Sequence, residues 1–106
     1  MTDILLIRVN CPDQAVALHI GESVVRAKLA ACANVEGPAD SIYWWDGELQ
    51  REEEWVLVLK APADNWADIE SRVIDLHPQD TPAILAIPCV QANARYADWL
   101  KAASGR

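Results

Sequence analysis

Hydrophobic and polar residues along the chain follow two patterns, the short apolar runs of strands and the three-to-four spacing of helices. A first run from Ile4 to Val9 ends at Asn10-Cys11-Pro12 and predicts a buried strand. A helix is expected next, with Asp13 as its N-cap. Its apolar face is Ala17, Ile20, Gly21, Val24, Val25 and Leu29, and His19 lies off that face in solvent.

The stretch from Ser41 to Lys60 predicts a long aromatic β-hairpin. Its first arm carries Ile42-Tyr43-Trp44-Trp45, and its second arm, residues 55–59, is apolar without a break, as in a strand buried on both faces. Asp46-Gly47 between the arms readily adopts the positive φ angles of a two-residue turn. Residues 30–35 lead into a second strand, which is interrupted at Gly37-Pro38 before the aromatic arm, so a bulge or a sheet edge is expected there.

The second half of the chain predicts a helix, a strand and a further helix. Asp64 is expected to cap a helix that ends at His77-Pro78, because a residue before proline avoids the helical region. Its apolar stripe is Trp66, Ile69, Val73 and Leu76. A fourth strand follows at residues 84–88, and Asn93 is expected to cap a short helix. The inner face of that last helix is Tyr96, Trp99, Leu100 and Ala103.

The predicted order, β-α-β-β-α-β-α, indicates an α+β fold made of one domain, residues 1–106. Two β-α-β units joined by a hairpin form a ferredoxin-like sandwich, with an antiparallel sheet and helices on one face. The opposite face is then bare although the third strand is apolar on both sides. Another copy of the chain is the simplest cover, so we expect a homo-oligomer.

Composition narrows the classes of function. The chain has 106 residues and a net charge of −7, which argues against nucleic acid, since phosphate contacts need clustered Lys and Arg. No apolar run approaches the roughly 20 residues that span a bilayer, and the N-terminus does not resemble a signal peptide. Three cysteines without a CxxC pair suit a reducing compartment. We therefore expect a cytoplasmic protein without nucleic-acid or membrane partners.

Several segments together resemble the divalent-cation tolerance (CutA) family. They are Leu29-Ala-Ala-Cys-Ala-Asn34, Ser41-Ile-Tyr-Trp-Trp-x-Gly47, Leu57-x-x-Lys60, Leu76-His-Pro78, Thr81-Pro82 and Tyr96-x-x-Trp-Leu100. The resemblance runs from about Ile4 to Leu100. It implies a compact homotrimer similar to the PII signalling proteins, with hairpins paired between subunits and clefts between them. It also implies a role in tolerance to copper and other divalent cations, without a settled biochemical mechanism.

The chain departs from the family's pattern in one segment. The family resembles His-Pro-Tyr-(Glu/Gln)-x-Pro-Glu, whereas this chain reads His77-Pro78-Gln79-Asp80-Thr81-Pro82-Ala83. Gln79 and Ala83 replace an aromatic residue and a carboxylate in the segment that the resemblance places along the inter-subunit cleft. The turn Asp46-Gly47-Glu48 is acidic where relatives often carry Lys. We expect the fold to survive these changes.

Candidate metal ligands are His77, Asp80 and Cys32, for copper or another divalent cation. An imidazole at a helix end can ligate a metal, but a ring bonded to a nearby carbonyl is the more common arrangement. Asp80 is the one donor that local sequence places beside His77. A thiolate site would suit Cu(I), yet the topology separates the three cysteines within one chain. Such a site therefore requires more than one chain, and a buried Cys is commonly a small hydrophobe.

Other candidates concern the cleft and the interface. Lys60, Trp45 and His77 are the expected cleft residues, and Lys60 is the basic group best placed to meet an anion. Tyr43, Trp44, Trp45 and Trp55 are the expected trimer contacts. In Glu52-Glu53-Glu54, only Glu52 and Glu54 can converge on a cation, and a solvated charge run that protects a sheet edge is the default interpretation.

Two functions remain open at this point. The first is a trimeric divalent-cation tolerance protein that binds metal. The second is a PII-like trimeric scaffold or signalling module, whose inter-subunit clefts bind a partner protein or a small anion. No nucleophile triad or glycine-rich phosphate loop is present in the sequence, so we expect no catalytic residues and no enzyme.

Overall fold

The computed structural model describes residues 2–105, which form one four-stranded antiparallel sheet and three α-helices. The elements are β1 (Ile4–Cys11), α1 (Gln14–Arg26), β2 (Cys32–Trp45), β3 (Glu48–Pro62), a 3-10 turn (Ala63–Asn65), α2 (Trp66–Leu76), β4 (Ile84–Pro88) and α3 (Ala94–Ala103). The α+β class and the predicted order of strands and helices are thus confirmed.

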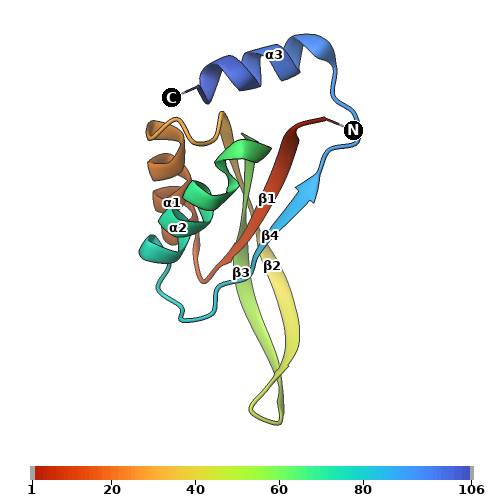
Figure 1. The fold of residues 1–106 in the computed structure, drawn as a ribbon. Coiled ribbons are helices and arrows are strands. Elements are labelled where there is room, and N and C mark those ends of the chain that lie inside the picture. The colour runs from red at the N-terminus through yellow and green to blue at the C-terminus, as the bar shows by residue number, and fades with distance from the viewer. Residues whose placement is uncertain (1, 106) are drawn as a thin grey trace.

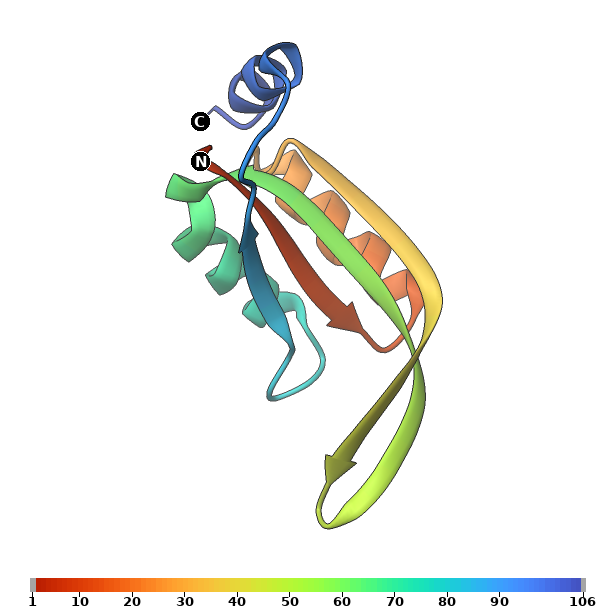
Figure 2. The same ribbon diagram turned by 90° about the vertical axis from the view of Figure 1, so that its right-hand side faces the viewer.

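The sheet has the strand order β2-β3-β1-β4, which places the first strand of the chain in the interior of the sheet. Helices α1 and α2 cover one face, while the opposite face is turned toward the viewer in Figure 2. Side chains alternate between the faces of a strand. Ile7 and Val9 of β1, with Leu57 and Leu59 of β3, are therefore fully buried against the helices. We call the opposite side the open face.

Helix α1 begins as its sequence predicts. The Oδ1 atom of Asp13 accepts a hydrogen bond of 2.9 Å from the backbone N–H of Val16, which satisfies one of the free amides at the helix start. Apolar residues Ala17, Ile20 and Val24 are fully buried on the sheet side, whereas His19 is exposed as expected. Local capping thus placed the start of this helix, whereas its end was predicted too late, because Leu29 lies beyond Arg26, the last residue of α1.

The prediction that Asp64 caps α2 is wrong. The 3-10 turn shifts the cap to Asn65, whose side chain makes no capping bond. Its Nδ2 atom instead donates to the carbonyl of Leu29 at 2.9 Å and to that of Ser104 at 3.4 Å. Asn65 thus ties the start of α2 to two distant parts of the chain.

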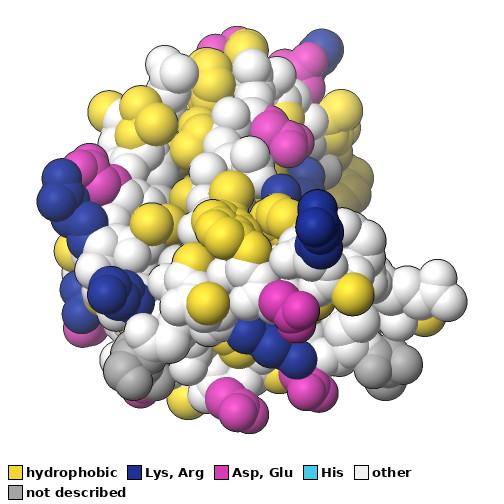
Figure 3. Space-filling view, turned by 90° about the horizontal axis from the view of Figure 1, so that it is seen from above, with side chains coloured by type: hydrophobic (Ala, Val, Ile, Leu, Met, Phe, Trp, Pro, Cys, Tyr) yellow, Lys and Arg dark blue, Asp and Glu magenta, His cyan; other side chains and the backbone are white. Residues whose placement is uncertain are grey.

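The inner face of α3 also differs from the prediction. Leu100 is buried and Tyr96 is partly buried, but Trp99 is 49% exposed. The Trp99 ring lies 5.5 Å from the Tyr96 ring, centroid to centroid. Helix α3 lies at the end of the molecule away from the hairpin, and hydrophobic side chains gather among charged ones on this end (Figures 1 and 3). The helix covers too little of the sheet to bury Trp99.

The hairpin of β2 and β3 projects beyond the helices and gives the molecule dimensions of 46 × 25 × 22 Å (Figures 1 and 2). Trp45 pairs with Glu48, so Asp46 and Gly47 form the predicted two-residue turn, with φ angles of 52° and 76°. The register shifts between Glu36 and Ala39, and β2 is an edge strand. Both predictions for Gly37-Pro38, a bulge and an edge, are confirmed.

Candidate functional site

A hollow of about 770 Å³ lies between the hairpin and the loop that joins α2 to β4. Its walls include Tyr43 and Trp45 of β2, Glu52 and Glu54 of β3, and Asp80 of the loop. Ser41 pairs with Glu52 and Tyr43 with Gln50, and directly opposed residues project to the same face. Strand pairing therefore aligns aromatic and acidic side chains along one wall of this acidic hollow.

The pKa of Tyr43 is raised above its usual 10.0. The first cause is the hydrogen bond that its phenol donates to Glu52, and burial and the negative charges of Glu52 and Glu54 act in the same direction. The phenol therefore remains protonated at neutral pH and acts as a donor toward Glu52.

Glu54 is the most enclosed carboxylate of the hollow, with 9% of its surface exposed. Its Oε1 atom accepts one long hydrogen bond of 3.5 Å from Nδ2 of Asn10. Within residues 2–105 no Lys, Arg or His nitrogen lies within ion-pair distance of Glu54. The interpretation of residues 52–54 as a solvated charge run is thus wrong for Glu54, which the 79–83 loop and Asn10 help to enclose.

His77 fastens the loop to β1. Its Nδ1 atom accepts the backbone N–H of Gln79 at 3.1 Å, so the ring proton is on Nε2, which donates to the carbonyl of Asn10 at 2.8 Å. This neutral tautomer uses both ring nitrogens. The ring-to-carbonyl bond weighed in the sequence is present, and it holds Asp80 beside the acidic hollow. A metal-ligand role for His77 stays a prediction, and requires one of these bonds to break.

Cys32 does not meet His77 within one chain. It pairs with Lys60 near the end of the sheet that carries α3, whereas Asn10, the partner of His77, pairs with Val56. The four residue steps from Val56 to Lys60 along β3 correspond to about 13 Å. Among residues 2–105 no three His, Cys, Asp or Glu side chains come close enough to hold a metal ion. All three cysteines are free, and Cys11 lies toward the opposite end of the sheet from Cys32.

Lys60 and Trp45 also lie far apart in one chain, because Trp45 is beside the hairpin turn and Lys60 near the other end of β3. The Nζ atom of Lys60 lies 5.6 Å from the ring centroid of Tyr96 in α3, a cation–π contact. A cleft containing both residues therefore needs a second chain.

The predicted interface aromatics divide into two groups. Trp44 and Trp45 are 72% and 62% exposed, and Tyr43 is 36% exposed. Trp55 instead packs against the core of its own chain, and its ring lies so close to Gly37 that a Cβ atom there would be 2.8 Å away. The exposed group is available to another molecule, whereas much of Trp55 is already buried.

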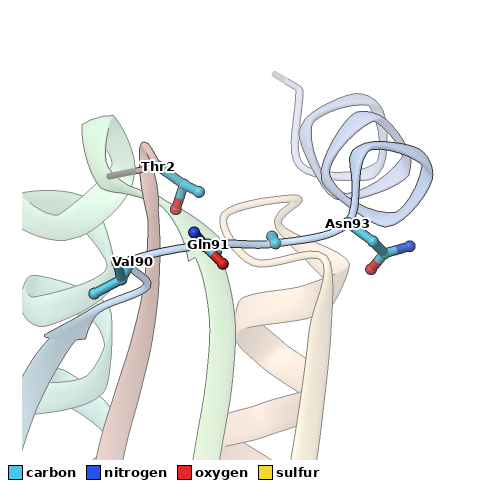
Figure 4. Close-up of a pocket in the computed structure, with 5 residues that line it drawn as sticks. Thr2, Val90, Gln91 and Asn93 are labelled. Carbon is cyan, nitrogen blue, oxygen red and sulfur yellow. The ribbon is translucent and has the colours of Figure 1, made fainter.

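A second, shallower hollow of about 540 Å³ lies where the segment after β4 turns toward α3 (Figure 4). It is lined by Thr2, Val90, Gln91, Ala92 and Asn93, none of which is ionisable. The Thr2 hydroxyl donates to the carbonyl of Cys89 at 2.8 Å. This hollow has no charged group with which to hold an ion, so the acidic hollow is the stronger candidate.

Comparison with known proteins gives a consistent result. The family model described as CutA1 divalent ion tolerance protein matches residues 5–103. A divalent-cation tolerance protein CutA from Thermus thermophilus is 36% identical over 105 residues, which cover 99% of this chain and 100% of that protein.

Solved structures agree over nearly the whole chain. CutA1 from the psychrotrophic bacterium Shewanella sp. SIB1 has a TM-score of 0.95 at 33% identity, covering 99% of this chain and 98% of its own. The CutA of Archaeoglobus fulgidus, described as periplasmic, has a TM-score of 0.93 at 27% identity, with coverage of 96% and 99%. No helix within residues 2–105 has the length and apolarity needed to cross a membrane. The chain belongs to the CutA1 family of divalent ion tolerance proteins.

Proposed function

We propose that this protein contributes to tolerance of copper and other divalent cations as a homotrimer of ferredoxin-like subunits, arranged as in the PII proteins. The exposed aromatic hairpin is the observation that carries the proposal. Ile42, Trp44, Trp45 and Leu49 are each at least 60% exposed on an arm that projects beyond the helices. Exposed apolar surface of this kind is typical of contacts between proteins.

Metal binding in this proposal involves groups from more than one chain. Of the three predicted ligands, Asp80 lines the acidic hollow, His77 supports its loop, and Cys32 lies elsewhere on the sheet. A hard cation favours carboxylate oxygens, whereas Cu(I) favours thiolate. Neighbouring chains are therefore needed to complete either donor set.

Native mass spectrometry of metal-free and Cu²⁺-treated protein tests assembly and metal binding together. We expect a species of three 11.7-kDa chains that gains a fixed number of ions.

Calorimetric titration with Cu²⁺ and Zn²⁺ should give saturable binding tighter than about 10 μM. Asp80→Asn should weaken it, whereas Asp98→Asn on exposed α3 should not. A trimer that binds neither metal would exclude metal binding from the proposed function, and only the proposed assembly would stand.

The second candidate, a trimeric scaffold that binds a partner protein or small anion, has one observation in its favour. Lys60 is partly buried, contacts the Tyr96 ring and has no carboxylate in ion-pair distance within the described chain. Pull-down from lysate compares Lys60→Ala with Lys101→Ala, which removes an exposed lysine of α3. Identical partner lists for the two variants would exclude Lys60 from the mechanism.

We further propose a cytoplasmic, non-catalytic protein. Free cysteines support the location, because unpaired thiols persist in reducing compartments. The CutA1 family is one of divalent ion tolerance proteins, which supports a function without catalysis. Fractionation of cells, with a cytoplasmic and a periplasmic marker protein, tests the location directly.

A further inference from the structure

Glu54 has no positively charged partner within residues 2–105. A carboxylate removed from water is costly unless it is paired or fully hydrogen-bonded. Glu54 is about nine-tenths buried and its hydrogen bond from Asn10 is 3.5 Å long. No fully buried side-chain oxygen of the described residues lacks a partner, so the carboxylate keeps a narrow contact with solvent. The carboxylate lines the acidic hollow, so the missing charge has a route of entry.

Among the described residues, Arg8 is a positive charge without an acidic partner on the same face of the sheet. It is exposed on the open face, directly across from Val58 of β3 and Leu85 of β4. No carboxylate of the described chain lies within ion-pair distance of it. Leu85 is 62% exposed and the nearby Ile87 is 47% exposed. Arg8 is thus a single positive charge within an apolar strip.

The two charges do not pair within one chain. Alternation along β3 places Glu54 on the same face as Val58, the residue opposite Arg8. Four residues of strand, about 13 Å, separate Glu54 from Val58. Glu52 and Glu54 line the hollow on the part of β3 nearer the hairpin turn, whereas the apolar strip lies on β1 and β4 in the body of the sheet.

We propose that Arg8 of one copy enters the acidic hollow of the next copy and pairs with Glu54. This inference rests on the homotrimer proposed above. In a closed ring each subunit uses two different surfaces, one toward each neighbour. The hairpin surface carries Tyr43 and Trp45 beside carboxylates, and the strip carries Leu85 and Ile87 around an arginine. The surfaces are complementary in both apolar character and charge.

This pairing explains why a buried carboxylate is compatible with the fold. The planar guanidinium donates two parallel hydrogen bonds to a carboxylate, which satisfies both of its oxygens. Arg8 becomes desolvated by the same contact and is neutralised by it. A second copy therefore completes the site, and each copy supplies one group and receives the other.

A double-mutant cycle tests the pair. Arg8→Met and Glu54→Gln keep similar volumes while removing the charges. The dissociation constant of the assembly is measured by sedimentation at one fixed urea concentration, since urea does not screen charges. Each single variant should raise it by at least about tenfold, because close charge pairs at interfaces couple strongly. The double variant should have a dissociation constant no higher than that of the single variant that dissociates more readily, because the second substitution then removes a charge that has already lost its partner.

Matched controls are available on both sides of the pair. Glu53→Gln removes the neighbouring carboxylate, which projects to the opposite face of β3, and Arg95→Met removes an exposed arginine of α3. Both should dissociate like the unmodified protein. Arg8→Lys should recover part of the loss, because it restores the charge without the planar fork.

Each possible outcome decides the question. Arg8 is exposed in the single chain, so Arg8→Met tests the pair even if Glu54→Gln fails to fold. A trimer that Arg8→Met leaves unchanged, or single effects that simply add, would overturn the pairing while the trimer stands. A Glu54→Gln effect without an Arg8→Met effect would assign the hollow to a free cation instead. A monomeric unmodified protein would overturn both the pairing and the proposed assembly.

Discussion

Cys11 shows at the residue scale how burial controls reactivity. Its side chain is fully buried at the end of β1. Burial, followed by the negative charges of Glu54 and Asp13, raises the pKa of the Cys11 thiol from 9.0 to about 11. The thiolate is the nucleophile and the metal ligand, so Cys11 is the least reactive of the three cysteines in the folded chain.

We expect a thiol reagent at pH 8 to modify the partly exposed Cys32 and Cys89 before Cys11.

The raised pKa of Cys11 also makes the stability of the fold depend on pH. Between pH 9 and 11 the folded state retains a proton that the unfolded state loses, so this contribution is complete below pH 9 and is lost as the pH rises to 11. The loss is about 2 kcal/mol. Comparing Cys11→Ala with the unmodified protein in urea at pH 8 and 10.5 measures it, and parallel losses in both would exclude Cys11 as its source.

Single residues differ in how far sequence predicts them. Asp13 was predictable because its capping bond reaches Val16, three residues away. Asp64 was not, because Asn65 takes the cap position while bonding to Leu29 and Ser104, which are distant in sequence. The burial of Glu54 depends on Asn10 and on the 79–83 loop in the same way. Local patterns carry no information on such contacts.

At the scale of elements, the hairpin was the best predicted part of the molecule. The turn, the bulge and the edge position follow from Asp46-Gly47 and Gly37-Pro38. These residue types are selected by backbone conformation alone. Strand β3 has one end that packs on the helices and one end that projects from the molecule, and the sequence predicts strand for both. For this reason the sequence alone did not predict that Trp55 is more buried than Trp45.

Two glycines of the hairpin should respond differently to alanine. Gly47 has a φ of +76° with nothing within 4 Å of a new Cβ atom, so Gly47→Ala should cost strain only, about 1 kcal/mol. Gly37 has a φ of +153°, and a Cβ atom there would lie 2.8 Å from the Trp55 ring. Gly37→Ala should therefore cost more, about 2–3 kcal/mol. Urea unfolding measures both, and equal costs would contradict the close approach of Trp55.

At the scale of the whole molecule, the distribution of aromatic residues separates folding from assembly. Trp66 packs against the core of helices and sheet, whereas Trp45 is 62% exposed on the projecting hairpin. A fully buried tryptophan contributes up to several kcal/mol through an area of roughly 150–250 Å². The two residues should therefore stabilise different things, one the subunit and the other the contact between subunits.

We expect Trp45→Ala to weaken assembly more than Trp66→Ala, and Trp66→Ala to lower the unfolding temperature more than Trp45→Ala. Sedimentation velocity over a dilution series measures the first effect, and thermal unfolding followed by circular dichroism measures the second. If both variants dissociate at the same concentration, Trp45 is not an interface residue.

The position of β1 has a consequence for how the protein is made. β1 is synthesised before β3 and β4, which begin at Glu48 and Ile84, but it lies between them in the sheet. At translation rates of about 5–20 residues per second, β1 waits on the order of 4–15 seconds for the strand that closes its second side. One edge of the apolar segment Ile4–Cys11 is unpaired throughout that time. Slowed translation should therefore promote aggregation of the nascent chain before any mature subunit exists.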